Sequence, residues 1–590
     1  MRYVEILQEC YIRRGQFIQF RSKIMAFFGI AQQSTALTAS TATDTISFFS
    51  ESASAVASAV SVYGLAGNDL ISLAAQGRTA IATASSVSTF TQIGYQTGAA
   101  AILSGTNVTN AVLVGSATYT TGNTINASTG VLASGALTAS LVITNQVAIT
   151  GVVTSERGLR QTNASLYSMG DGNDKIYLGN SITTFTSTTI DGGDGNDIIN
   201  NDSYLDGVVT TANANASAFT AATYEKAFIE GDLGNDSIRF AFTGGSLSAV
   251  TFQGGQGNDE ILIDADQGVV GYANNLLAGG GGNDSISGQF GIISSNTIAG
   301  GGGNDTINLN STTTVSNLIV GDTFNTTDQF DGSDNISGSN TLMSSTTIQA
   351  GAGNDVVSIS YVDGGSNLIE LNRGNDTFNT DSIVSASTIQ GGEGNDTFNF
   401  YTGAQASIIK GGGNNDIVSI SGAAAIANTT IYGGEGADVL GRSATLAAGI
   451  TYGATFGYDS YTESTLSAMD TISVNNALSG TFNTYNNFGG LSRGSFATSY
   501  ATATNGVAIF SATFDNNVTA RVAALDSNVT TTGAVILFQD GDRKNYAFIQ
   551  GGANDLVFQI GTGANNVAIT QANSTVTLTN NNKSIAFLVD

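Results

Sequence analysis

The sequence predicts an all-β protein: a parallel β-roll or β-solenoid with coils of roughly 20 to 25 residues and a β-structured cap at its C-terminal end. Two observations predict the solenoid. A glycine-rich motif of the form Gly-Gly-x-Gly-Asn-Asp, such as GGEGND at 391–396, recurs at a nearly fixed interval. Apolar residues also alternate with polar ones on both sides of the motif, which is the pattern of half-buried strands.

The recurrence of the motif sets the coil length. Two intervals, from Asp197 to Asp236 and from Asp305 to Asp355, are about twice as long as the others, so we expect each to contain one further coil and the chain to form about thirteen coils. An isolated copy ending at Asp69 is expected to be a plain turn, and GGAND, which ends at Asp555, is one residue short and is not counted as a site. The eleven counted copies end at Asp174, Asp197, Asp236, Asp259, Asp284, Asp305, Asp355, Asp376, Asp396, Asp416 and Asp438.

An apolar frame surrounds each motif. A large apolar residue stands two positions before the motif, as Ile389 does, and another stands two positions after its Asp, as Phe398 does. Each repeat is therefore expected to read strand, glycine-rich corner, strand and second corner. Stacked coils would pair their strands in parallel and fill a narrow interior with the apolar side chains.

The corner itself has the composition of a cation site. Glycines permit positive φ and close approach of backbones, so that carbonyl oxygens can gather in one place. The Asp adds a carboxylate, and carboxylates stacked about 4.8 Å apart repel one another by roughly 1 kcal/mol in water and by more at lower dielectric. A cation between the layers removes that repulsion, and a cluster of carboxylate and carbonyl oxygens suits Ca²⁺.

The segments GGDGNDIIN, GGQGNDEIL, GGGGNDTIN and GGEGNDTFN resemble the RTX, or haemolysin-type, calcium-binding repeat. The resemblance covers about Met169 to Leu440. It implies a parallel β-roll that binds Ca²⁺ between successive corners through loop carbonyls and the last Asp. It also implies a bacterial origin, with a cyanobacterial one as the narrower expectation. Besides the eleven Asp residues above, the ligand candidates that it implies are Gly192, Gly231, Gly254, Gly279, Gly300, Gly302, Gly391, Glu393, Gly411 and Gly433.

The second corner departs from that family pattern. Many RTX proteins carry the nine-residue unit in tandem, so both edges of the roll bind Ca²⁺. Here the second corner is rich in Ser, Thr, Asn and Ala, as in ISSNT before Ile298 and VSAST before Ile389. We therefore expect a single column of roughly ten calcium ions on one edge.

Composition divides the chain into four regions. Residues 1–33 are unusually basic, and either they contain a short signal-like segment or translation starts at Met25. Residues 34–163 are Ala/Ser/Thr-rich and are expected to be β-structure, with low-complexity flexibility as the alternative. Residues 164–448 are expected to form the calcium-binding solenoid. Residues 449–590 are expected to form the C-terminal β cap and secretion region, because VILFQDGDRKNYAFIQGGANDLVFQIG is similar to the cap of many bacterial RTX proteins.

Composition also excludes several functions. With 46 acidic and 19 basic residues and a net charge of −27, the chain is not expected to bind nucleic acid. It has no His, so no HExxH zinc site, Ser-His-Asp triad or Cys-His pair can exist, and its single Cys, Cys10, forms no internal disulfide. No apolar run approaches the 18 residues of a transmembrane segment.

Three functions remain after these exclusions. The favoured one is a non-enzymatic structural protein of the cell surface, of S-layer, sheath or adhesin type, which folds on calcium outside the cell and associates with copies of itself or with cell-surface glycan. The second is a secreted polysaccharide-acting enzyme that uses the repeats as a folding module, and the third is a soluble secreted passenger of other use. The RTX resemblance implies the type I secretion apparatus as a partner and an extracellular location.

Overall fold

The computed structural model describes most of the chain from residue 161 onward: residues 161–178, 184–200, 222–242, 245–265, 269–322, 332–421, 427–442, 453–473, 480–483, 490–561, 569–572, 574–579 and 584–589. Before residue 161 it describes residues 60–72 and separate strands. The chain forms two compact units, Met1–Gly291 and Ile292–Asp590. Within the described residues, no helix is both long and apolar enough to cross a lipid bilayer.

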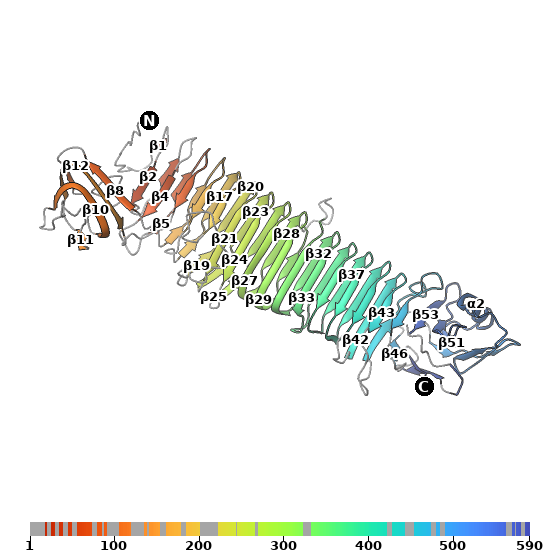
Figure 1. Ribbon diagram of the computed structural model, residues 1–590. Coiled ribbons are helices and arrows are strands. Elements are labelled where there is room, and N and C mark those ends of the chain that lie inside the picture. Colours follow the sequence, from red (N-terminus) through yellow and green to blue (C-terminus); the bar gives the residue numbers. More distant parts are fainter. Residues whose placement is uncertain are drawn as a thin grey trace. The chain divides into compact units, whose positions relative to one another are not determined.

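Both units contain stacked coils, and we name their sheets by position around the coil (Figure 1). Sheet A holds the strand that precedes the glycine-rich corner, and sheet B holds the strand that follows it. In the first unit, sheet A pairs in parallel in the order β1 (Ile18–Gln19), β3 (Thr35–Thr38), β6 (Val60–Tyr63), β14 (Leu166–Ser168), β17 (Thr189–Asp194), β20 (Phe228–Leu233), β23 (Thr251–Gln256) and β26 (Leu276–Gly281).

Sheet B of the first unit has the same parallel order. It runs through β2 (Met25–Gly29), β4 (Thr45–Phe49), β7 (Leu70–Ser72), β15 (Lys175–Tyr177), β18 (Ile198–Asn200), β21 (Ser237–Phe242), β24 (Glu260–Ala265) and β27 (Ser285–Ser294). A further strand of each coil precedes the second corner: β5 (Val56–Ser58), β13 (Gln161–Asn163), β16 (Thr184–Thr186), β19 (Ala222–Glu225), β22 (Gly245–Ser248) and β25 (Val269–Ala273).

The second unit repeats this arrangement. Its sheet A contains β28 (Thr297–Gly302), β30 (Leu318–Val320), β32 (Thr347–Ala352), β34 (Leu368–Arg373), β37 (Thr388–Glu393), β40 (Ile408–Gly413), β42 (Ala427–Glu435) and β44 (Gly453–Gly457), with the short strands β36 (Ile383–Ser385) and β39 (Gly403–Gln405) at the second corner. Its sheet B contains β29 (Thr306–Val315), β31 (Asn335–Ser344), β33 (Val356–Tyr361), β35 (Thr377–Thr380), β38 (Thr397–Phe400), β41 (Ile417–Ile420), β43 (Val439–Arg442) and β45 (Thr471–Ser473).

The predicted apolar frame forms the core of these coils. Ile389 and Phe398, which flank one motif, are fully buried, and each stacks on the equivalent residue of the next coil, Ile409 and Val418. The half-buried residues between them face outward, as the alternation predicts. The prediction of a parallel all-β solenoid is thus confirmed.

The second corner is held by hydroxyl and amide side chains. A residue in the left-handed region, such as Ala386 with a φ of 46°, precedes a buried polar residue, Ser387. The backbone N–H of Ser387 donates to Ser407 Oγ of the next coil at 3.2 Å. A non-glycine residue in this conformation costs about 1–2 kcal/mol, which the buried hydrogen bond offsets in part.

The region 34–163 is not continuous β-structure of one kind. Its first strands are coils of the solenoid, because β3 and β6 belong to sheet A and β4 and β7 to sheet B. After β7, the strands β8 (Thr79–Ala84), β9 (Ser88–Phe90), β10 (Thr106–Tyr119), β11 (Gly135–Leu137) and β12 (Leu141–Val153) form a separate antiparallel sheet. Most of residues 1–33 lie outside the described residues.

The C-terminal region closes the second unit. Strand β53 (Leu556–Ile560) pairs in parallel with β45, so the cap extends sheet B beyond the last coil. Antiparallel strands β51 (Ala534–Gln539) and β52 (Asn545–Ile549) follow on from β53, and β49 (Ala501–Thr504) pairs with β50 (Val507–Phe510). Short strands β47 (Ser492–Arg493) and β48 (Phe496–Ala497) also join the cap, while β46 (Gly480–Asn483), β54 (Ser574–Thr579) and β55 (Ser584–Val589) form a small antiparallel sheet.

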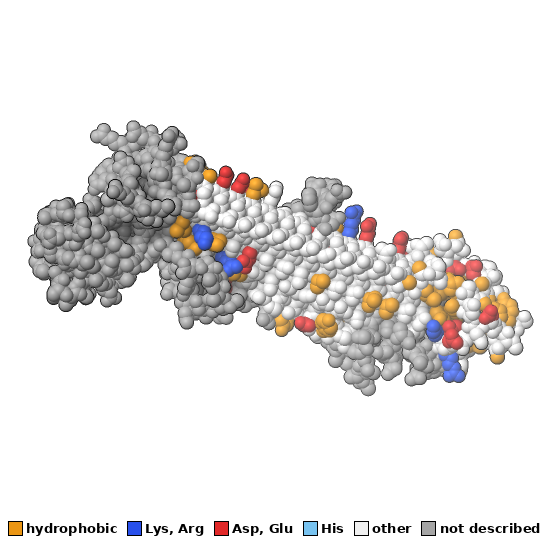
Figure 2. All heavy atoms as spheres, turned by 45° about the horizontal axis from the view of Figure 1, so that its top comes forward, with side chains coloured by type: hydrophobic (Ala, Val, Ile, Leu, Met, Phe, Trp, Pro, Cys, Tyr) orange, Lys and Arg blue, Asp and Glu red, His pale blue; other side chains and the backbone are white. Residues whose placement is uncertain are grey.

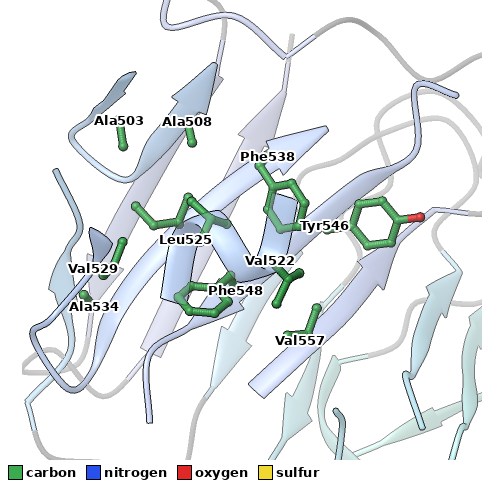
Figure 3. Packing of buried hydrophobic residues seen from close by; sticks show 11 residues of the cluster. Ala503, Ala508, Val522, Leu525, Val529, Ala534, Phe538, Tyr546, Phe548 and Val557 are labelled. Atoms are coloured by element: carbon green, nitrogen blue, oxygen red, sulfur yellow. The ribbon is translucent and has the colours of Figure 1, made fainter. Parts of the chain in front are cut away.

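The cap also contains a helix, α2 (Val518–Asn528), that the all-β prediction did not include. Asn517 caps its N-terminus, with the side chain accepting from the backbone N–H groups of Thr519 and Ala520. Leu525 of this helix packs into a core with Phe538 and Phe548 of the sheet (Figure 3).

Candidate metal centre

The motif Asp residues form a buried column along one corner of the second unit. The backbone N–H of each Asp donates to Oδ1 of the Asp in the next coil: Asp376 to Asp396 at 2.9 Å, and Asp396 to Asp416 at 2.8 Å. These side chains are at most 3% exposed. The same bond links the whole series Asp305, Asp334, Asp355, Asp376, Asp396, Asp416, Asp438 and Asp470.

The first unit holds a second column of the same kind, and Asp69 belongs to it. The interpretation of Asp69 as a plain turn is therefore wrong: its backbone N–H donates to Asp174 Oδ1 at 2.5 Å, and its flanking strands pair with those of Asp174. The column comprises Asp69, Asp174, Asp197, Asp236, Asp259 and Asp284.

The two long intervals have different explanations. The interval from Asp305 to Asp355 contains a further coil, as expected, with Asp334 in the column. The interval from Asp197 to Asp236 does not, because the backbone N–H of Asp197 reaches Asp236 Oδ1 directly at 2.7 Å. The extra residues of that interval stand between β18 and β19, where 201–221 lie outside the described residues, so the expectation of an additional coil there is wrong.

In eleven Asp residues of the two columns, the other carboxylate oxygen is buried and accepts no hydrogen bond. Oδ2 is in this state in Asp174, Asp197, Asp236, Asp259, Asp334, Asp355, Asp376, Asp396, Asp416, Asp438 and Asp470. A buried carboxylate oxygen without a donor is costly unless a cation or a proton compensates it. This oxygen is the strongest single sign that the corner suits a positive charge.

In most corners, a glycine at the first position leaves room for that charge. A Cβ on Gly391 would lie 2.1 Å from Asp396 Oδ2 and 2.4 Å from the carbonyl oxygen of Gly411 in the next coil. The equivalent pair of oxygens, 2.3–2.6 Å away, flanks the corresponding position of Gly192, Gly231 and Gly254. Only glycine therefore lets the carboxylate of one coil and the carbonyl of the next approach the same point.

The remaining predicted ligands lie at two kinds of position. The carbonyls of Gly279 and Gly433 face the carboxylates of Asp259 and Asp416 in the preceding coil, as the resemblance implies. Glu393 lies elsewhere: its side chain is exposed, 3.5 Å from Arg373, and its carbonyl accepts from the N–H of Gly374. Gly302 holds the same corner position as Glu393. We therefore leave Glu393 and Gly302 out of the ligand set.

Asp555 remains apart from both columns. Its Oδ1 accepts the N–H of Gly551 within the cap at 3.0 Å, a local bond inside the GGAND segment. Outside the Asp column, an exposed column of Asn residues braces the same corners, as where the N–H of Asn395 donates to Asn375 Oδ1 at 2.8 Å.

Three members of the columns, Asp69, Asp334 and Asp470, do not belong to the eleven motif copies found in the sequence. Asp69 ends the isolated copy that was expected to be a turn. Inserted residues separate Asp334 from the first glycine of its corner, Gly321, and separate Asp470 from Tyr458, which stands at the first-glycine position. All three nevertheless carry the apolar residue two positions later, namely Ile71, Ile336 and Ile472, each buried. That spacing is the signal that identifies them.

Burial raises the pKa of the column carboxyls. Desolvation raises the pKa of Asp197 to about 8 and that of Asp416 to about 8, with neighbouring Asp charges adding to the effect. The same cause raises the pKa of Asp355 to about 7 and that of Asp396 to about 6. Without a cation, these groups therefore hold protons up to about pH 6 to 8, whereas the unfolded chain, with an ordinary Asp pKa near 3.9, has already lost them there.

We predict that acid partly replaces calcium. Because the folded pKa values exceed the unfolded one, the folded, calcium-free column binds more protons, and its stability is greatest below about pH 4 and falls as pH rises through 6 to 8. In chelator, circular dichroism should thus show more β-structure at pH 5 than at pH 8. An Asp416→Asn variant, which cannot ionise there, should lose less β-signal over that range. A β-signal that rises with pH in chelator would contradict the assignment of the pKa shifts.

The donor set fits a hard cation. In the described part of the chain, no group of three or more acidic, Cys or His side chains converges as a ready-made metal site. A bound ion would therefore take one or two Asp oxygens and complete its shell with corner carbonyls, which is oxygen-only coordination of flexible geometry. Such sites suit Ca²⁺ better than Mg²⁺, which demands a regular octahedron. Fold and site together define a cation-binding parallel β-solenoid.

Comparisons with known proteins identify the repeat. A model of the RTX calcium-binding nonapeptide repeat matches four copies, at residues 189–203, 269–307, 385–404 and 427–440. The chain therefore contains RTX calcium-binding repeats within its coils. No curated protein matched it.

Three solved structures show similarity of low extent. A hyperactive, Ca²⁺-dependent, β-helical antifreeze protein from an Antarctic bacterium is 22% identical, with 51% of this chain and 86% of that chain covered and a TM-score of 0.26. The Gp54 tailspike of Acinetobacter baumannii bacteriophage AP22, solved in complex with capsular saccharide, is 11% identical, with 94% and 87% covered and a TM-score of 0.20. The Pseudomonas phage phi297 tailspike gp61 is 11% identical, with 94% and 86% covered and a TM-score of 0.18.

Proposed function

We propose that this protein is secreted in an unfolded, calcium-free form and folds outside the cell into a structural component of the cell surface, of S-layer, sheath or adhesin type. The observation that carries the proposal is that Oδ2 is buried and without a donor in eleven Asp residues of the two columns, the eleven named above. A fold that depends on filling them is stable only where calcium is abundant, and extracellular modules bind calcium with a Kd of about 10⁻⁴–10⁻³ M.

In this proposal, the ligands of each ion are the Asp carboxylate of one coil and the first-glycine carbonyl of the next. In the coil of β37 these are Asp396 and the carbonyl of Gly411, and the same pair of a carboxylate and a next-coil glycine carbonyl recurs at the corners of Gly192, Gly231, Gly254, Gly300 and Gly411. Filling about ten such sites would offset most of the net charge of −27. Calcium supplies charge compensation and cross-links successive coils, and no step of a reaction is assigned to it.

The structural role follows from what the described surface offers. The coils present long regular ladders of Ser, Thr and Asn side chains, and most aromatic side chains of the coils, such as Phe378 and Phe398, are buried in the interior. Extended sheets with repeated small polar residues suit contact over a large area rather than binding of one small ligand.

The test of this role is the location of the protein with and without chelator. In the producing cell, we expect the protein in the surface fraction in millimolar Ca²⁺ and in the medium, unfolded, after chelation. A truncation after Gly561, which retains the β53 strand that pairs with β45, should test the contribution of the C-terminal segment to export without removing the cap sheet. Protein that stays in the cytoplasm with full β-structure would contradict the proposal.

A polysaccharide-acting enzyme is the second candidate, because two carboxylates line one hollow of the cap. Asp526 and Asp555 border a cavity of about 480 Å³ beside α2, and burial raises the pKa of Asp555. A carboxylate pair is the machinery of glycoside hydrolysis. We expect no hydrolysis. Reducing ends released from an acidic polysaccharide by the native chain, and not by Asp555→Asn, would reverse the order of the two candidates.

A further inference from the structure

We propose that the outer face of sheet B in the second unit docks against the same face of a second copy of this chain. The proposal rests on the proposed structural role for its purpose, but its evidence is independent of the calcium column. We call this surface the sheet B face. It consists of the outward residues of β29, β31, β33, β35, β38, β41, β43 and β45.

The sheet B face is built from two columns of uncharged side chains. The first column runs through Thr306, Asn335, Val356, Thr377, Thr397 and Ile417, and it continues into β43 and β45. The second runs through Asn308, Ser337, Ser358, Asn379, Asn399 and Ser419. Val356, Ile417 and Val439 are 37%, 45% and 40% exposed, so this face also presents aliphatic side chains to solvent.

The side chains of this face are already ordered. Nδ2 of Asn399 donates to Asn379 Oδ1 at 3.0 Å, and Nδ2 of Asn379 donates to Ser358 Oγ at 3.1 Å. The neighbouring column is dominated by Thr, Val and Ile, whose β-branched side chains have few rotamers to lose. Docking such a face therefore costs less conformational entropy than docking a surface of long flexible side chains.

Charge decides where two copies can meet. Each chain carries −27, so contacts through acidic surfaces are repulsive. The outer face of sheet A bears Glu370 and Lys410, and the Arg373–Glu393 ion pair lies at its edge. The two columns of the sheet B face contain no ionisable side chain, and charged side chains are sparse over the described coils in Figure 2. Two copies can thus approach through the sheet B face without opposing like charges.

The repeat distance favours a second copy over a glycan chain. The columns repeat at the strand spacing of about 4.8 Å, and a second copy has the same spacing by construction. Eight coils can then interdigitate without accumulating mismatch, as identical sheets do when they pack about 10 Å apart. The repeat length of a sugar polymer differs from the strand spacing, so its contacts with the face would lose register along the coils.

Area sets the strength of the contact. Eight coils spaced about 4.8 Å apart, with about 15 Å of strand each, offer roughly 600 Å² per copy. A stable dimer buries about 800 Å² per partner, so one such contact should be weak and reversible. Many copies anchored side by side would strengthen it through effective concentration, which suits a surface layer.

The test compares matched variants of the full chain in millimolar Ca²⁺ by sedimentation velocity over a concentration series. Thr377→Glu combined with Thr397→Glu places two charges on the sheet B face. The control, Thr347→Glu combined with Thr388→Glu, adds the same charge to outward positions of sheet A with comparable exposure. We expect the native chain and the control to associate reversibly, and the sheet B variant to need at least a tenfold higher concentration. Circular dichroism verifies that all three are folded.

A charge-pair experiment separates face-to-face docking from an indirect effect. A variant with Thr377→Lys and Thr397→Lys should remain monomeric alone but associate with the corresponding Glu variant. A native chain that remains monomeric at every concentration overturns the proposal, as does equal loss of association in both Glu variants. Monomeric native chain that binds purified cell-wall glycan through the sheet B face would assign this face to glycan instead. If association is confirmed but the protein is not found at the cell surface, only the proposed function fails.

Discussion

Chelation is expected to unfold the coils of both units at neutral pH. Each filled site stabilises the folded state by about 1.4 kcal/mol when calcium is tenfold above Kd. A column of eight Asp residues therefore gains on the order of 10 kcal/mol, which is the size of the whole stability of an ordinary domain. Removal of calcium takes away this term and leaves buried carboxylates without compensation.

Circular dichroism and tryptic digestion in a calcium titration measure this effect. We expect a cooperative rise of β-signal at about 10⁻⁴–10⁻³ M Ca²⁺ and protection of the coils from trypsin over the same range. Magnesium at equal concentration is the control and should restore much less structure, because the flexible carbonyl-rich corners do not impose octahedral geometry. Full β-signal in chelator at pH 8 would show that the columns need no cation.

The regular part of the fold could be predicted because its two signals reinforce each other. The glycine-rich corner occurs at a fixed spacing from the apolar pair, as in Ile389 and Phe398. Because this combination recurs in successive coils, it supports a solenoid more strongly than a single copy does. The direction of pairing also follows, since a coil that returns to its starting edge can pair with the next only in parallel. The stacking of the motif Asp residues along one corner therefore follows from the sequence.

The exceptions share one physical cause. An insertion that loops out of a coil leaves the pairing of the flanking strands unchanged. Two Asp residues of adjacent coils can therefore be far apart in the sequence and still be in contact. The antiparallel sheet β8–β12 separates Asp69 from Asp174 in the sequence. The backbone N–H of Asp69 nevertheless donates to the carboxylate of Asp174. In the same way, residues inserted inside the corner separate Gly321 from Asp334, although a Cβ on Gly321 would meet Asp334 Oδ2 at 2.2 Å.

The cap was less predictable because its elements lack a repeat. Its strands were foreseen from apolar runs such as AVILFQ, which forms the buried β51. Helix α2 was missed, since a single helix in a chain of strands carries no periodic support, and its best signal is the Asn517 cap before VTARVAAL. The sequence shows that the second corner lacks the glycine motif, but the left-handed conformation of its Ser, Ala and Asn residues is seen only in the structure.

Gly411→Ala is expected to disable one site, whereas Gly413→Ala, two residues away in the same corner, should be nearly silent. A Cβ on Gly411 would lie 2.2 Å from Asp416 Oδ2 and 2.4 Å from the carbonyl oxygen of Gly433, so it occupies the place where those oxygens converge. A Cβ on Gly413 meets nothing closer than 3.9 Å. Gly411 and Gly413 do not have a positive φ, so their backbone conformation accepts alanine. Gly412, between them, has a φ of 123° and is left unchanged in both variants.

The expected size of this effect follows from two terms. Overpacking costs about 1–3 kcal/mol, and loss of one filled site removes about 1.4 kcal/mol more in tenfold excess of calcium. Gly413→Ala should change stability by less than about 0.5 kcal/mol. Thermal unfolding in saturating Ca²⁺ and in chelator measures both terms, because the calcium-dependent part should shrink in Gly411→Ala and remain in Gly413→Ala. Equal calcium dependence in the two variants would mean that the glycine corner does not hold the ion, since only one of the two substitutions fills the space between the carboxylate and the carbonyl.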